Sequence, residues 1–265
     1  MKYQIVSDLH LEFYDTADIQ YEEFISKTDA ECLILAGDIC TCSPQLDKFL
    51  EHVSKEYKYI VYIPGNHEYY GGDIHATKIL LKDMCSKYPN VHLLDNGVFI
   101  PNEETVILGT TLWSYIPEEH KHIVKNGMSD FYRIGNMTEH RGFNIDDMNC
   151  LYLDNNKKWL EEMLESYGDG NNSDEETNKY KTIIVVTHHL PTFELIHPKY
   201  LGSQLNYAFA NSGLESLIGQ ASVWVAGHSH SSAMKEINGC LCVTNPRGYK
   251  HEINPEYVSG YVFDL

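Results

Sequence analysis

The stretch YIVYIPGNHEYYGGD, residues 59–73, joins an apolar run to a turn rich in polar side chains. The run YIVYI predicts a buried strand that ends at Pro64. Asn66, His67 and Glu68 follow, so an amide, an imidazole and a carboxylate stand together at the end of that strand. Two interpretations are open: an ordinary turn, or one corner of a site assembled from several strand ends.

Apolar runs alternate with helical patterns through the first third of the chain. Strands are predicted at 3–6, 32–36 and 59–63, and helices near 21–27, 44–55 and 72–88. This β-α-β-α-β opening is typical of parallel strands buried on both faces. The shorter runs at 91–94, 97–100 and 105–109 have no helix between them, so they predict strands that turn back locally and make the sheet mixed.

The later part of the chain is less regular. Residues 113–143 have no clean period and mix aromatic residues with His, Gly and Asn, which indicates an excursion over the surface. A helix is predicted from about 146 to 166, and the polar stretch 168–179 is interpreted as a mobile loop. Further strands are predicted at 182–186, 221–226, 233–237, 240–243 and 260–263. Because no repeat or linker divides the chain, residues 1–265 are predicted to form one domain, with a substrate-capping excursion at about 113–145.

The composition and the lengths of the apolar runs predict a cytoplasmic protein. With 265 residues and 43% hydrophobic content, the chain can form one large core. No apolar run approaches the ~20 residues that span a bilayer, and the first residues lack the core of a signal peptide, so no membrane association is expected. Seven cysteines, an odd number spread along the chain, favour reduced thiols. The net charge of −18 argues against nucleic acid as a partner, but not against a phosphate held by metal ions.

Polar residues stand at the ends of the five strongest apolar runs. They are Asp8, His10, Asp38, Asn66, His67, His188, His189, His228 and His230. All are oxygen or imidazole ligands. In open α/β sheets ligands bind beyond the carboxyl ends of the strands, so these side chains are predicted to converge. Each motif alone could be a turn or a packed histidine, but their shared placement at strand ends favours a site.

The ordered set D-x-H, G-D, G-N-H-E, H and G-H-x-H resembles the calcineurin-like metallophosphoesterase superfamily over residues 8–230. The resemblance implies a four-layer α/β/β/α sandwich of two mixed β-sheets flanked by helices, with a two-metal centre at the strand ends. Carried over by motif, one metal is expected at Asp8, His10 and His230, and the other at Asn66, His188 and His228. Asp38 is expected to bridge them. His189 stays open as the alternative to His188, or as a residue that orients it or touches substrate.

The resemblance also implies an activity, the hydrolysis of small phosphomonoesters or phosphodiesters by a hydroxide that two metal ions activate. Mn, Fe or Zn are the expected ions, with Mg, Co or Ni as alternatives. His67 is expected to give a proton to the leaving oxygen, and Glu68 to orient His67 or raise its pKa. Weaker candidates for substrate contact are Arg247, Asn245, His189 and Trp113. For Arg247, a salt bridge within the C-terminal loop is an equal alternative.

Within the superfamily, the chain departs from the protein phosphatases. The segments SDLHLE and AGDICTCS lack the arginines that those enzymes use to hold phosphoserine or phosphothreonine. The motifs are closer to the phosphodiesterase and general phosphohydrolase branches. Substrate selection is expected from residues 113–143, whose aromatic side chains could form a wall over the metals. The competing hypotheses are a non-catalytic scaffold that binds a phosphate ligand or a protein, and a structural metal protein; the complete set of expected ligands favours an enzyme.

Overall fold

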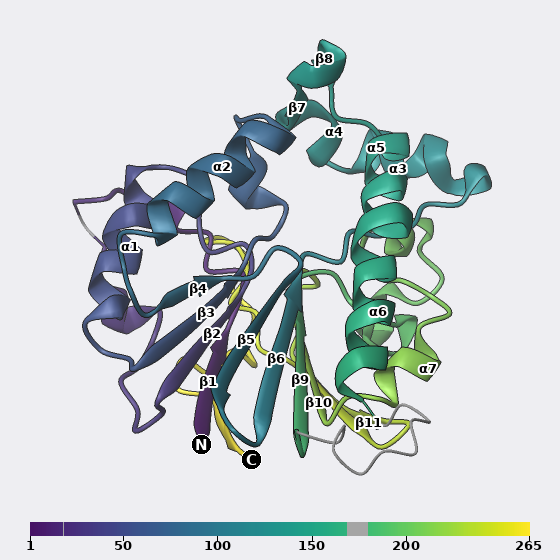
Figure 1. Ribbon diagram of the computed structural model, residues 1–265. Coiled ribbons are helices and arrows are strands. Elements are labelled where there is room, and N and C mark those ends of the chain that lie inside the picture. The colour runs from purple at the N-terminus through teal and green to yellow at the C-terminus, as the bar shows by residue number, and fades with distance from the viewer. Residues whose placement is uncertain (18, 169–179) are drawn as a thin grey trace.

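The computed structural model describes residues 1–17, 19–168 and 180–265, and its centre is a pair of mixed β-sheets (Figure 1). The strand order is β13-β1-β2-β3-β4 in the first sheet and β11-β12-β10-β9-β6-β5 in the second. The first sheet contains β1 (Lys2–Val6), β2 (Cys32–Ala36), β3 (Tyr59–Ile63), β4 (Val91–Leu93) and β13 (Val262–Asp264). The second contains β5 (Gly97–Asn102), β6 (Thr105–Thr110), β9 (Thr182–Thr187), β10 (Val223–Ala226), β11 (Ala233–Ile237) and β12 (Cys240–Thr244).

Each sheet has a parallel centre and antiparallel edges. Strands β1 to β4 pair in parallel, and β13 joins β1 antiparallel. In the second sheet β6, β9, β10 and β12 are parallel, while β5 and β11 are antiparallel edge strands. The carboxyl ends of the parallel strands therefore lie at one edge of both sheets. The two chain termini meet at the opposite end, where the Met1 amino group donates to the Leu265 carbonyl oxygen at 3.1 Å (Figure 1).

Three apolar clusters fill the spaces between the layers. Side chains from both sheets, including Ile34, Val61 and Val186, form the cluster between them. Leu33 and Leu35 point the other way, toward the helices outside the first sheet, because successive strand residues face opposite sides. The third cluster lies outside the second sheet. This arrangement confirms the predicted sandwich of helices, sheet, sheet and helices.

Helices cover the outer face of each sheet (Figure 1). Their bounds are α1 (Pro44–Ser54), α2 (Ile74–Cys85), α3 (Lys121–Gly127), α4 (Asp130–Arg133), α5 (Ile145–Cys150), α6 (Lys158–Tyr167) and α7 (Glu215–Ile218). A π-helical segment, Leu151–Lys157, joins α5 to α6, so the helix predicted near 146–166 is present. The helix predicted near 21–27 is wrong, because only one 3₁₀ turn, Tyr21–Glu23, forms there.

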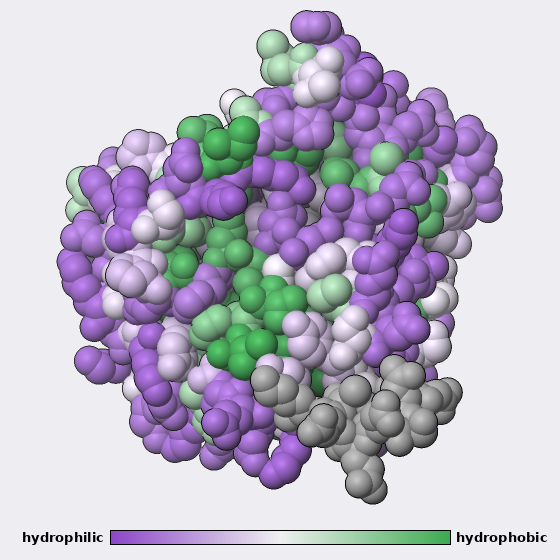
Figure 2. Space-filling model, in the orientation of Figure 1, coloured by the Kyte–Doolittle hydropathy of each residue, from purple (hydrophilic) through white to green (hydrophobic). Residues whose placement is uncertain are grey.

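The predicted excursion contains more structure than its sequence indicated. It holds α3, α4 and a small ribbon of β7 (Gly135–Asn136) and β8 (Arg141–Gly142), which projects beyond the sheets (Figure 1). The predicted mobile loop at 168–179 lies, apart from Gly168, outside the described residues. None of the described helices has the length and apolar content needed to cross a membrane. In Figure 2 hydrophilic side chains cover most of one face, with a hydrophobic strip over the edge strands β4 and β5.

Candidate metal centre

The turns after five strands bring the candidate ligands together. Asp8, Asp38 and Asn66 follow β1, β2 and β3 of the first sheet, and His188 and His228 follow β9 and β10 of the second. All five side chains are buried. Because the parallel strands of both sheets end at the same edge, residues far apart in the sequence meet there.

The backbone of these turns is unusual. Asp8, His10, Asp38, His228 and His230 all have positive φ, between 49° and 67°. Non-glycine residues rarely adopt this conformation, which costs roughly 1–3 kcal/mol each and concentrates at functional sites. Close approach also requires the preceding glycines. A Cβ at Gly65 would collide with the Asp38 carboxylate, and one at Gly37 with the His188 ring.

The first ligand group consists of Asp8, His10 and His230. The Nε2 atoms of His10 and His230 are 2.9 Å apart, and His230 Nε2 is 3.3 Å from Asp8 Oδ1. All three ligand atoms lie within 4.8 Å of one another. Two imidazole nitrogens and a carboxylate oxygen that face one point make a donor set that fits a divalent transition metal.

The second ligand group consists of Asn66, His188 and His228. His188 Nε2 is 3.1 Å from the Asn66 side-chain oxygen. His228 contributes a nitrogen within 4.8 Å of ligand atoms from His188 and Asp38. The Asn66 amide nitrogen donates to Asp130 Oδ1 at 2.7 Å, which leaves its oxygen facing the cluster.

Asp38 lies between the two groups and faces both. Its Oδ1 is 3.3 Å from His188 Nε2, and its Oδ2 is 3.9 Å from His10 Nε2. Burial raises the pKa of Asp38, but the nearby imidazoles outweigh burial and hold this pKa well below its usual range. The carboxylate is therefore charged and has one oxygen available to each group, which is the arrangement that a bridging ligand requires.

Backbone carbonyl groups fix two of the histidine rings. His188 Nδ1 donates to the Ala36 carbonyl oxygen at 2.9 Å, and His228 Nε2 donates to the Ala208 carbonyl oxygen at 3.2 Å. A carbonyl only accepts, so these nitrogens carry protons, and in the neutral rings the other nitrogens have lone pairs free for a metal ion. Without such an ion, burial lowers the pKa of His188, but the charges of Asp38 and Asp8 outweigh burial and raise this pKa to about 10. Such outer contacts orient the imidazoles of metal sites. Position favours His188 over His189 as the ligand, because the His188 ring nitrogen lies in the cluster.

His67 stands beside the centre without belonging to either group. Its Nδ1 is 2.8 Å from Glu12 Oε1, and its Nε2 is 3.9 Å from Asp38 Oδ2 and 3.2 Å from the Tyr249 hydroxyl. Burial lowers the pKa of His67, but the charges of Asp38 and Glu12 outweigh it and raise the pKa to about 9. Cations bound at Asp38 would counteract this increase.

The expected partnership of Glu68 with His67 is not what the structure shows. The Glu68 carboxylate accepts hydrogen bonds from the backbone N–H groups of Asp38, Ile39 and Gly65 and from the Tyr62 hydroxyl, at 2.7–3.0 Å. Glu68 therefore ties the turns after β2 and β3 together. Glu12 takes the place beside His67, and its Oε1 also lies 3.3 Å from His10 Nδ1. The sequence signal for Glu12 was its position two residues after His10 in SDLHLE.

Two of the proposed substrate contacts, Trp113 and Asn245, have other partners. Trp113 is 1% exposed and packs against Tyr69 and Phe143 in the core outside the second sheet. The Asn245 amide donates to the carbonyl oxygens of Ile5 and Val258. These contacts hold the fold, and neither side chain lines a hollow beside the centre.

Arg247 and His189 are also held away from the solvent side of the centre. Arg247 donates to the Tyr14 hydroxyl at 2.6 Å, and its guanidinium carbon lies 4.3 Å from the Phe24 ring centroid. It forms no salt bridge with a described carboxylate, so the predicted salt bridge is wrong. Arg247 also does not line either hollow beside the centre. His189 Nδ1 lies 2.7 Å from Ser114 Oγ, and its ring stacks on His228 with centroids 4.1 Å apart. The His189 ring therefore packs against the candidate ligand His228.

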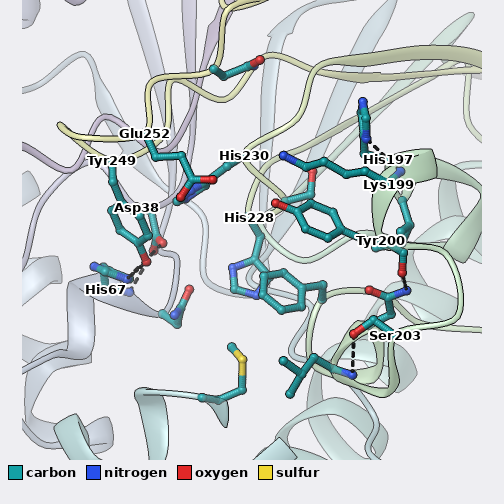
Figure 3. Close-up of a pocket in the computed structure, with 18 of the residues that line it drawn as sticks. Asp38, His67, His197, Lys199, Tyr200, Ser203, His228, His230, Tyr249 and Glu252 are labelled. Atoms are coloured by element: carbon teal, nitrogen blue, oxygen red, sulfur yellow. Dashed lines mark hydrogen bonds and ion pairs between the residues drawn. The ribbon is translucent and has the colours of Figure 1, made fainter.

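A hollow of about 310 Å³ opens beside Asp38, Asn66, His228 and His230 (Figure 3). His67 and Tyr249 stand on one side of it, and Tyr200 and Lys199 on the other. Its outer wall comes from residues 196–209 and 249–255. Sequence reasoning missed these residues because they lie on irregular segments without a motif.

Two facing groups of candidate ligands at the carboxyl edge of a two-sheet sandwich are the arrangement expected of a metal-dependent phosphoesterase. The calcineurin-like phosphoesterase family matches residues 1–232, and this chain belongs to that family. An uncharacterized protein of Acanthamoeba polyphaga mimivirus is 30% identical over 269 residues, covering 94% of this chain and 91% of the relative.

Solved structures share the fold at low identity. The phosphopantetheinyl hydrolase PptH from Mycobacterium tuberculosis is 16% identical, with a TM-score of 0.67, over 94% of this chain and 90% of that one. A dimetal phosphatase from Danio rerio is 13% identical, with a TM-score of 0.51, over 92% of this chain and 86% of that one. Both likenesses support the sandwich architecture.

Proposed function

We propose that this protein hydrolyses small phosphoric esters with water at a two-metal centre. The observation that carries the proposal is the position of Asp38, whose two carboxylate oxygens face two separate ligand groups. A site for one structural ion would not need a shared carboxylate. The imidazole and oxygen donors suit Mn, Fe or Zn, and can also take Mg, Co or Ni.

Two divalent ions would supply positive charge for the phosphoryl oxygens and would lower the pKa of water. The chain's own residues then orient the reaction. Asp8 and Asp38 bring about two negative charges, so a centre with two divalent ions stays cationic and attracts a phosphate. His67 Nε2 would protonate the leaving oxygen, and the contact of Nδ1 with Glu12 supports this role because it fixes the direction in which the ring points.

A small substrate in a reducing compartment fits the rest of the molecule. The hollow of about 310 Å³ matches a small organic group, and the net charge of −18 disfavours nucleic acid. All seven cysteines lie within the described residues and are free thiols, which supports a cytoplasmic location.

The test is ester hydrolysis by protein that has been stripped with a chelator and reloaded with Mn, Zn, Fe or Mg. We expect release of nitrophenolate from nitrophenyl phosphoesters only after reloading, together with two bound ions per chain by mass spectrometry. Activity that survives chelation would contradict the metal mechanism. Two bound ions without turnover of any ester would instead support a scaffold that binds a phosphate ligand or a protein.

A further inference from the structure

Two hollows, not one, adjoin His67. The first, of about 310 Å³, contains the four ligands that border solvent, and the second, of about 580 Å³, lies on the far side of His67. His67, Tyr249 and Glu252 line both hollows and form their common wall. A phosphomonoester has one organic substituent and needs one hollow, whereas a phosphodiester has two.

The first hollow has an apolar outer part. Met128, Ile196, Leu205 and Phe209 contribute to its lining, and Lys199 is the one lysine or arginine among its lining residues. Lys199 lies over the Tyr200 ring, with its Nζ 4.6 Å from the centroid. Apolar and aromatic side chains of this kind favour an aryl or alkyl substituent.

The second hollow has a different character because two cations line it. Arg133 lies over the Tyr70 ring, with its guanidinium carbon 5.7 Å from the centroid, and Lys250 lies over Tyr14 at 4.9 Å. Neither forms a salt bridge with a carboxylate of the described residues. Both side chains are therefore available to an anion, in a chain whose net charge is −18.

Two carboxylates also line the second hollow, and they weaken its positive character only in part. Glu12 is directed at the His67 and His10 rings, so its charge is already matched within the centre. Glu252 belongs to the wall shared by both hollows. The charged side chains that remain in the second hollow beyond this wall are Arg133 and Lys250.

We propose that the substrate is a phosphodiester with two unlike arms, an apolar arm in the first hollow and an anionic arm, ending in a carboxylate or phosphate, in the second. This proposal rests on the proposed function. In the reaction, the oxygen of water forms a bond to phosphorus and one P–O ester bond breaks. The leaving oxygen takes a proton, and a phosphomonoester of the other arm remains.

The experiment compares two matched diesters, carboxyethyl nitrophenyl phosphate and its neutral carbamoylethyl analogue, with nitrophenyl phosphate as the monoester. We expect both diesters to be hydrolysed by the metal-loaded protein, with kcat/KM about tenfold higher for the anionic arm. The double variant Arg133→Gln and Lys250→Gln should bring this ratio close to one. Lys48→Gln with Lys82→Gln, two exposed lysines on α1 and α2, should leave it unchanged.

A binding measurement separates recognition from catalysis. Calorimetric titration with the corresponding non-hydrolysable phosphonates should show the same preference for the anionic arm, and the same loss in the double variant. Turnover of the monoester with both diesters inert would overturn the inference and leave the proposed function intact. An unchanged ratio in the Arg133 and Lys250 double variant would also overturn it. Failure of every ester with every ion would instead refute the proposed function itself.

Discussion

The metal centre and the outer walls of the hollows are built in different ways. The ligands stand on short turns directly after strands, and all except His230 are buried. The outer walls, residues 196–209 and 249–255, are irregular, and Tyr200, Leu201 and Ile253 there are 42%, 68% and 49% exposed. The comparison indicates that the two sheets fix the chemistry, while loops that can change without disturbing the core fix the choice of substrate.

The largest expected loss of activity comes from Asp38, and it tests whether the turns at the strand ends carry the catalytic groups. Asp38→Asn removes the shared charge and should lower kcat/KM by about 1000-fold or more, since loss of outer contacts alone commonly costs about 10–100-fold. Metal analysis should show fewer than two ions per chain. Asp83→Asn, an exposed aspartate of α2, is the matched control and should retain both ions. Full loading and activity in the Asp38 variant would refute the bridging role.

His67→Asn should have the next largest effect and should depend on the leaving group. We expect a loss of about 100-fold or more with alkyl esters, because their leaving oxygens need a proton. Nitrophenyl esters should lose much less. The measurement is kcat for a series of leaving groups of known pKa. Equal losses across the series would mean that His67 has another role.

Glu12→Gln tests the residue that replaced Glu68 as the partner of His67. A neutral amide can still accept a hydrogen bond but lacks the charge, so kcat should fall about tenfold while KM changes little. Glu68→Gln is the informative comparison. It should act mainly on stability, by about 2–4 kcal/mol in chemical denaturation, because one carboxylate oxygen becomes an NH2 group that cannot accept hydrogen bonds from the two donors it faces. A large stability loss in the Glu12 variant and none in the Glu68 variant would reverse the two assignments.

The smallest effect is expected in the outer walls. Leu205→Asn places a polar group in the apolar part of the first hollow and should raise KM for aryl esters about threefold to tenfold, with little change in kcat. Ion content should stay at that of the unmodified protein. Loss of bound ions in this variant would show that walls and centre are not independent.

Sequence alone predicted the parts of the molecule that depend on neighbours along the chain. Each candidate ligand lies within four residues of the end of its strand, so recognition of the strand also placed the side chain at the edge where the structure has it. The alternating apolar runs predicted parallel strands with helices between them, and the resemblance to the metallophosphoesterases implied the order of layers. The prediction of a helix at 21–27 was wrong. The chain makes only one 3₁₀ turn there, Tyr21–Glu23, before it continues to β2.

What the sequence could not predict depends on contacts between distant residues. Glu68 is adjacent to His67 in the chain, but its carboxylate turns back to three backbone N–H groups, and Glu12 reaches His67 from another strand end. Trp113 and Arg247 follow strands as the ligands do, yet their side chains pack on aromatic rings. Side-chain direction after a strand is set by the packing available there, which no local pattern records.

The division of the ligands between the sheets has a mechanical consequence. Asp8 and Asn66 follow strands of the first sheet, and His188 and His228 follow strands of the second. The bound ions would therefore cross-link the two sheets at the edge where the parallel strands end. Ion binding would raise the free energy of unfolding by about 2.7 kcal/mol for each ion when free ions are at 100 times their dissociation constant. Removal of the ions would thus lower the stability of the fold as well as abolish the activity.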